Sequence, residues 1–149
     1  MVRGPGMWGD LPRRARWVAA GYVVGFAEGF CSHAYSLWTG GIHAYGRDPV
    51  LIQVLFHAML VFDALAVVLI IRASPAGPPL AAAAMLADAS ANWWTQAPDM
   101  ARHPLRYLVP FGLLPITLFG VFVLVTAIPL YQTIAARRPA ADQASRQLA

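Results

Sequence analysis

Four apolar segments separated by short polar turns dominate the pattern of hydrophobic positions along the chain. Each segment has roughly the 20 residues that an α-helix needs to cross a bilayer. Prolines at or near the starts of three segments are typical of a first helical turn. The pattern therefore predicts an all-α integral membrane protein, a bundle of four transmembrane helices. The predicted spans are approximately 17–38, 49–71, 79–97 and 110–132.

The composition supports a membrane protein. Apolar residues make up 58% of the 149 residues and charged residues 12%, whereas an average soluble domain has roughly 25% charged residues. All 11 basic residues are arginines, and eight of them fall on the side that the termini share with the second loop. The positive-inside rule then predicts a multi-pass protein with the segment 1–16 and the tail 133–149 in the cytoplasm, flanking a transmembrane domain over 17–132.

The same composition argues against several other classes. No basic patch interleaved with aromatics occurs outside the apolar segments, so we expect no nucleic-acid partner. The single cysteine, Cys31, cannot form an internal disulfide. Glu28 interrupts the first apolar segment, so we expect that segment to be retained as a helix and not cleaved as a signal peptide.

A carboxyl group lies near the middle of each of the first three predicted spans, at Glu28, Asp63 and Asp88. An acidic residue at the centre of a transmembrane helix costs about 2.5–3.5 kcal/mol on insertion scales. Alternating helix directions would bring the three groups to a similar depth, so we expect them to face a cavity as catalytic acids. The alternative is that they are protonated and hydrogen-bonded to one another, and only hold the helices together.

Further polar side chains gather in the outer halves of the same helices. The helical period of about 3.6 residues per turn places Ser32 and Tyr35 on the stripe of Glu28. The inner halves have almost no polar side chains, which favours a cavity open to the outer side over a continuous channel. The predicted ligand-binding residues are Ser32, His33, Tyr35, Gln53, His57, Asn92, Trp93 and Gln96.

Small residues predict where helices pack closely. Gly21, Gly25 and Gly29 form a GxxxGxxxG row on the first predicted span. This row is a candidate contact with a second copy of the chain or with a partner helix. The alanine-rich third span is expected inside the bundle, and the fourth, which has no ionisable residue, is expected to face lipid.

Carboxyl groups in a site of low dielectric suit two kinds of chemistry. Burial favours the neutral form, which can donate a proton, and a second, ionised acid can stabilise a cation. The predicted function is therefore the binding of a small hydrophobic ligand, either a sterol- or terpenoid-like molecule or an amine. Acid–base isomerisation or cyclisation is the reaction that such acids would catalyse. This chemistry requires no cofactor or metal.

Several short motifs resemble the EXPERA family, which includes the emopamil-binding protein and the sigma-2 receptor. They are Glu28-Gly29 in the first span, "DALAVVLIIR" closing the second, the loop "ASPAGPPL", Asp88 with aromatics close behind, and "VPFGLLPITLFGVFVL" in the fourth. The resemblance implies a membrane bundle of four or five helices with acids facing an intramembrane pocket.

The chain also differs from the sterol isomerase pattern of that family. Val24 stands where the pattern has a histidine one turn before the first glutamate. The second-span glutamate of the pattern falls nearer Gln53 than Asp63, and the asparagine and tryptophan of the last span are missing. The resemblance thus implies ligand binding or another acid-catalysed reaction, and not the isomerase reaction itself.

Three other functions are compatible with the same residues. His33 and His57 lie at similar depths on adjacent predicted helices, as bis-histidine ligation of a b-type haem requires. Intramembrane acids also mark proton- or cation-coupled transporters, although no inverted repeat is visible here. The short loops and the glycine row are also compatible with a non-catalytic subunit of a membrane complex.

Overall fold

The computed structural model describes residues 8–9, 11–108 and 112–137. Over these ranges the chain is all-helical and contains no strand. The four long helices are α1 (Arg13–Gly40), α2 (Val50–Ile71), α3 (Gly77–Arg102) and α4 (Leu113–Ala135), and two short 3-10 helices, η1 (Gly41–His43) and η2 (Pro104–Leu108), precede α2 and α4. The prediction of an all-α protein with four long helices is confirmed.

α1 and α3 are longer than the apolar segments that predicted them, whereas α2 and α4 differ from their predicted spans by at most three residues at each end. α1 begins at Arg13, four residues before the expected start, because the carbonyl of Pro12 already accepts a hydrogen bond from the Arg16 amide. α3 continues through Pro98 to Arg102, beyond the expected end at residue 97. Apolar patterning marks where a helix is buried, whereas backbone hydrogen bonds extend it into polar residues. The expected start of the fourth span at Pro110 lies outside the described residues.

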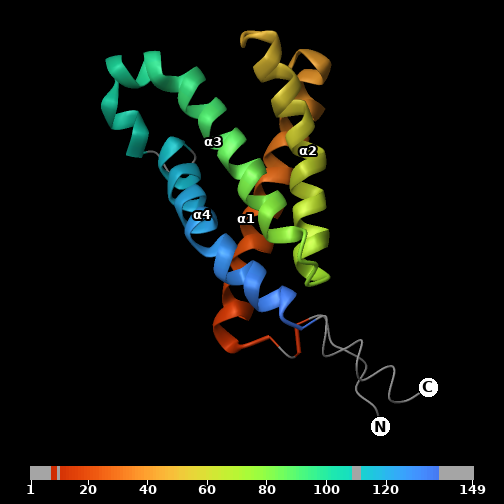
Figure 1. Ribbon diagram of the computed structural model, residues 1–149. Coiled ribbons are helices and arrows are strands. Elements are labelled where there is room, and N and C mark those ends of the chain that lie inside the picture. Colours follow the sequence, from red (N-terminus) through yellow and green to blue (C-terminus); the bar gives the residue numbers. More distant parts are fainter. Residues whose placement is uncertain (1–7, 10, 109–111, 138–149) are drawn as a thin grey trace, which may run out of the picture.

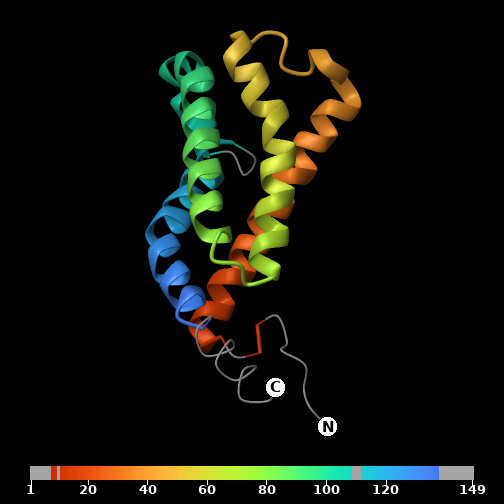
Figure 2. The same ribbon diagram turned by 45° about the vertical axis from the view of Figure 1, so that its right-hand side comes forward.

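The helices run alternately up and down, so α1 begins and α4 ends at the same end of the bundle (Figure 1). The α2–α3 turn lies at this end too, which we call the termini end. Towards the opposite, far end, the α1–α2 pair diverges from the α3–α4 pair (Figure 1), and α1 moves away from α4 (Figure 2). The core therefore lies mainly in the termini half, where Tyr22, Ile70 and Val123 are almost fully buried.

The glycine row on α1 packs against other helices of the same chain. A Cβ atom at Gly21 would lie 3.0 Å from the Phe122 ring, and one at Gly25 would overlap the ring of Phe119. A Cβ atom at Gly29 would lie 2.8 Å from Oδ2 of Asp63. The row therefore allows α4 and α2 to approach α1 closely, and its use as a contact with a second copy or a partner helix stays a prediction.

Two of the described helices, α2 with 22 residues and α4 with 23, could cross a membrane when judged by length and composition alone. α1 and α3 do not meet the same standard. α1 begins with three arginines in its first turn and carries Glu28 near its centre, and much of α3 is alanine. The expected four spans are thus four helices, of which two have the apolar character of a span.

Candidate functional site

A cavity of about 520 Å³ lies between the four helices, each of which contributes to its lining. This volume falls within the range of roughly 300–1,000 Å³ that is typical of small-molecule sites. The cavity forms where the two helix pairs diverge, beyond the point at which the rings of Phe119 and Phe122 hold α4 against α1. The divergence of the pairs thus leaves room for a ligand near the middle of the bundle.

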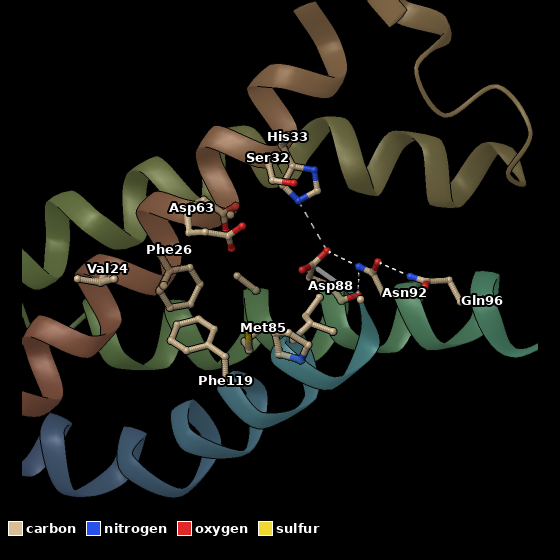
Figure 3. Close-up of a pocket in the computed structure, with 17 residues that line it drawn as sticks. Val24, Phe26, Ser32, His33, Asp63, Met85, Asp88, Asn92, Gln96 and Phe119 are labelled. Atoms are coloured by element: carbon tan, nitrogen blue, oxygen red, sulfur yellow. Dashed lines mark hydrogen bonds and ion pairs between the residues drawn. The ribbon is translucent and has the colours of Figure 1, made fainter. Parts of the chain in front are cut away.

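The structure brings the three predicted acids to this one cavity. Glu28 comes from α1, Asp63 from α2 and Asp88 from α3. Four more of the predicted residues join them in the lining, namely Ser32, His33, Asn92 and Gln96. Seven of the 11 predicted site residues therefore line the same space, and Figure 3 shows six of these with their labels.

Asp63 is the most deeply buried acid of the cavity, with only 6% of its surface exposed. Its carboxyl group lies against Gly29, where the missing side chain makes room for Oδ2. No described residue donates a hydrogen bond to it. A carboxyl group without a donor is costly to bury as an anion. Because Asp63 also lines the cavity, its carboxyl group is available to a ligand there.

Asp88 has a different environment on the facing side of the cavity (Figure 3). Nδ2 of Asn92 donates to its Oδ1 at 3.1 Å, and Nε2 of Gln96 donates to Oδ1 of Asn92 at 3.1 Å. Nε2 of His33 lies 3.8 Å from the same carboxyl oxygen. The spacing of one turn along α3 produces this ladder, because residues four apart on a helix face each other.

His33 is in turn held by Tyr45, which lies between η1 and α2. The Tyr45 hydroxyl is 2.9 Å from Nδ1 of His33. The Tyr45 ring packs on Phe56 at 5.0 Å and on His57 at 5.3 Å between ring centroids. Burial raises the pKa of Tyr45, a hydrogen bond with Ser36 lowers it, and the charges of Asp88 and Asp48 raise it further. The Tyr45 hydroxyl therefore keeps its proton at neutral pH.

Four predicted residues lie outside the cavity lining. Tyr35 is 70% exposed. Gln53 donates to the backbone carbonyl of Asp48 at 2.7 Å, and Nδ1 of His57 lies 2.6 Å from the carbonyl of Gln53. Trp93 donates to Oγ1 of Thr117 at 2.9 Å, which joins α3 to α4. Gln53 and His57 therefore shape the start of α2 and do not face the acids.

The apolar part of the lining was not predicted from the sequence, and it includes Phe26, Met85, Ile116 and Phe119. Phe26 and Phe119 meet edge to face, with ring centroids 5.3 Å apart and an interplanar angle of 69°. Nothing in the pattern distinguishes these side chains from ordinary core residues. Tyr45 was missed because a loop residue follows no helical period.

The positions of the histidines give no support to haem ligation. The Tyr45 ring packs against both of them, at 6.2 Å from His33 and 5.3 Å from His57. Nε2 of His33 lies 3.8 Å from Oδ1 of Asp88, and Nδ1 of His57 is hydrogen-bonded to the Gln53 carbonyl. Within the described ranges there is also no group of three or more His, Cys, Asp or Glu residues placed to hold a metal ion.

Comparisons with family models, with curated proteins and with solved structures found no match to this chain. The resemblance to the EXPERA family therefore rests on the short sequence motifs in the four predicted spans and in the second loop, and it stays a prediction. The chemistry and geometry of the cavity are accordingly the basis for a proposed function.

Proposed function

We propose that this protein is a multi-pass membrane protein whose cavity binds a small hydrophobic ligand that is sterol- or terpenoid-like or is an amine. We further propose that the acids of the cavity isomerise or cyclise such a ligand by acid–base catalysis. The observation that carries the proposal is the cavity of about 520 Å³ in which three carboxyl groups from three helices meet an apolar wall.

The outer surfaces of α2 and α4 support placement in a membrane. Both helices leave large apolar side chains exposed along their length, and soluble monomers rarely expose contiguous apolar surface on this scale. These side chains include Leu51, Val54 and Val61 on α2 and Leu118, Val125 and Ile128 on α4, each between 61% and 79% exposed. Six polar side chains of α1 and α3 line the cavity instead, which would let these less apolar helices cross beside α2 and α4.

The arginines support the expected orientation. Arg13, Arg14, Arg16, Arg72 and Arg137 belong to the termini end, and Arg47 and Arg102 belong to the far end. Arg3, Arg138 and Arg146 lie outside the described residues. Under the positive-inside rule the termini end faces the cytoplasm.

The mouth of the cavity supports a ligand that arrives from the bilayer. Val24, Glu28 and Ser32 line the cavity and are themselves exposed, with Val24 at 70%. They follow one another at intervals of one turn, so the opening runs along α1. In a bilayer this opening faces the hydrocarbon, where a hydrophobic ligand is concentrated.

The lining also matches the chemistry of an isomerisation. An apolar ligand body would pack on Phe26, Met85 and Phe119, with its reacting carbon near the acids. One carboxylic acid would donate a proton to one carbon of a double bond, and a carboxylate would remove a proton from a neighbouring carbon. The double bond moves, no electrons are gained or lost, and no co-reactant is consumed.

Native mass spectrometry of the purified protein, with extraction of co-purifying small molecules, tests the proposal. We expect a specific hydrophobic ligand with the wild type and its loss in Glu28→Gln and Asp88→Asn. Asp99→Asn is the matched control, because Asp99 is an exposed acid on α3 that does not line the cavity. Only bulk phospholipid in every sample would refute a ligand site and favour a non-catalytic subunit. A ligand retained equally by all variants would place its site elsewhere.

A further inference from the structure

We infer that Asp63 and Asp88, the inner pair of cavity acids, have different roles in proton transfer. Asp63 is the carboxylic acid, and Asp88 is the carboxylate, which the pair Tyr45–His33 keeps ionised. This inference rests on the proposed function and deepens it, because it names the group that gives the proton and the group that receives one.

The difference in hydrogen-bond donors carries the assignment. Asp88 accepts a hydrogen bond from Asn92 at 3.1 Å and faces Nε2 of His33 at 3.8 Å. The part of the chain that the structure describes offers no donor to Asp63. Hydrogen bonds to a carboxylate favour the charged form, and burial without them favours the neutral form.

The other groups around the cavity do not reverse this difference. Glu28 is the remaining acid in the lining, and it sits on the exposed side of α1 at the mouth. α4 contributes Pro115, Ile116 and Phe119, and Gly112 precedes it in the lining; none of these residues titrates. His33 is the single basic side chain in the described lining, and it faces Asp88. Two neighbouring carboxylates repel each other, so one negative charge on the inner pair belongs on Asp88.

Tyr45 acts as a positioning residue through the tautomer of His33. A neutral imidazole has one nitrogen that donates and one that accepts. When the Tyr45 hydroxyl donates to Nδ1, the ring proton must lie on Nε2, which then presents an N–H to Asp88. A movement of about 1 Å brings this N–H within hydrogen-bond distance of the carboxylate. The packing of the Tyr45 ring on Phe56 and His57 does not depend on the hydroxyl.

With these roles, each proton transfer of the proposed isomerisation has a donor and an acceptor. Asp63 donates its proton to a carbon of the ligand, and the positive charge that develops lies near the Asp88 carboxylate. Asp88 then removes a proton from a neighbouring carbon. Return of this proton from Asp88 to Asp63 across the shared cavity restores the starting state, so the protein is unchanged after each turnover.

Infrared spectroscopy of the ligand-free protein at neutral pH tests the assignment through the carbonyl stretching band of protonated carboxyl groups. We expect this band in the wild type and in Asp88→Asn, and its loss in Asp63→Asn. A band lost in Asp88→Asn, or absent from the wild type, would overturn the assignment. If Asp63→Asn fails to fold, the Asp88→Asn spectrum still decides, because any loss of the band there contradicts it.

The positioning role of Tyr45 is tested separately, by infrared spectroscopy and by ¹⁵N NMR of the histidines. In Tyr45→Phe we expect a second protonated carboxyl band, and we expect Asp88→Asn in that background to remove it. ¹⁵N NMR of the histidines should show the Nε2–H tautomer of His33 in the wild type and a mixture in Tyr45→Phe. Tyr131→Phe is the control, since Tyr131 is 45% exposed and lies outside the cavity lining. An unchanged tautomer and spectrum in Tyr45→Phe would refute the positioning role. Neither measurement needs a bound ligand, so both outcomes are independent of the extraction experiment.

Discussion

Tyr22 is the residue that joins α1 to α4 most directly in the termini half. It is fully buried, and its hydroxyl donates to the carbonyl of Val123 at 2.7 Å and lies 3.1 Å from Oγ1 of Thr126. We expect Tyr22→Phe to lower the free energy of unfolding by about 1 kcal/mol, the typical net contribution of one hydrogen bond. Thr126 keeps its own bond to the carbonyl of Phe122, so no buried hydroxyl is left without a partner.

Denaturant titration of the detergent-solubilised protein measures this change. Tyr131→Phe serves as the control, because its side chain is exposed on the same helix that Tyr22 contacts. Surface substitutions usually change stability by less than about 0.5 kcal/mol. Equal stabilities of the two variants would show that the Tyr22 hydroxyl does not hold α1 against α4.

At the residue scale, the sequence predicted which side chains are unusual but not always where they point. Asp63, Asp88 and Asn92 were found because a polar group in the middle of an apolar helix needs a cavity or a partner. Tyr35 shares a stripe with Glu28, yet α1 extends beyond the region where the other helices surround it, and the side chain is exposed. Helical periodicity gives a direction around an axis and does not say what lies in that direction.

At the scale of elements, the contact of α1 with α4 depends on Gly25. A Cβ atom there would overlap Cζ, Cε2 and Cε1 of Phe119, so any larger side chain must displace a ring that also lines the cavity. We expect Gly25→Val to destabilise the protein by about 1–3 kcal/mol, as overpacking usually does. The displaced ring should also reduce the volume available to a ligand.

Denaturant titration and the amount of ligand extracted from the purified variant test the two effects. Gly120→Ala on α4 is the matched control, because the nearest atom to its new Cβ, Cγ of Met85, lies at an ordinary 3.7 Å. If Gly25→Val were as stable as Gly120→Ala and retained as much ligand, Phe119 would not be confined by α1.

The existence of the four helices could be predicted from the sequence because apolar runs of this length separated by prolines and polar turns have few other structures. Their ends could not, since the first turn of α1 contains three arginines and α3 passes through Pro98. The contribution of α4 to the cavity was also unpredictable, because its lining residues are apolar or glycine. An apolar residue against a ligand and one against a neighbouring helix have the same signature.

At the scale of the whole molecule, the up-and-down order of the helices places the α1–α2 turn at the far end and the α2–α3 turn at the termini end. Ile42 in η1 lies at the far end and is 76% exposed, and Ala76 in the α2–α3 turn is exposed at the termini end. If the bundle spans a membrane in the proposed orientation, these two positions face opposite compartments. This difference separates the proposed topology from a peripheral or soluble bundle, in which both positions would meet the same solution.

Cysteine labelling in intact cells measures the difference. Cys31, which is exposed, is first replaced by serine, and Ile42→Cys and Ala76→Cys are then made separately. We expect a membrane-impermeant maleimide to label Ile42→Cys in intact cells and Ala76→Cys only after the membrane is permeabilised, because the excess of arginine holds the termini end in the cytoplasm. The reverse pattern would show that the chain spans the membrane in the opposite sense. Labelling of both positions only after permeabilisation would contradict the membrane-spanning topology, and with it the entry of ligands from the bilayer along α1.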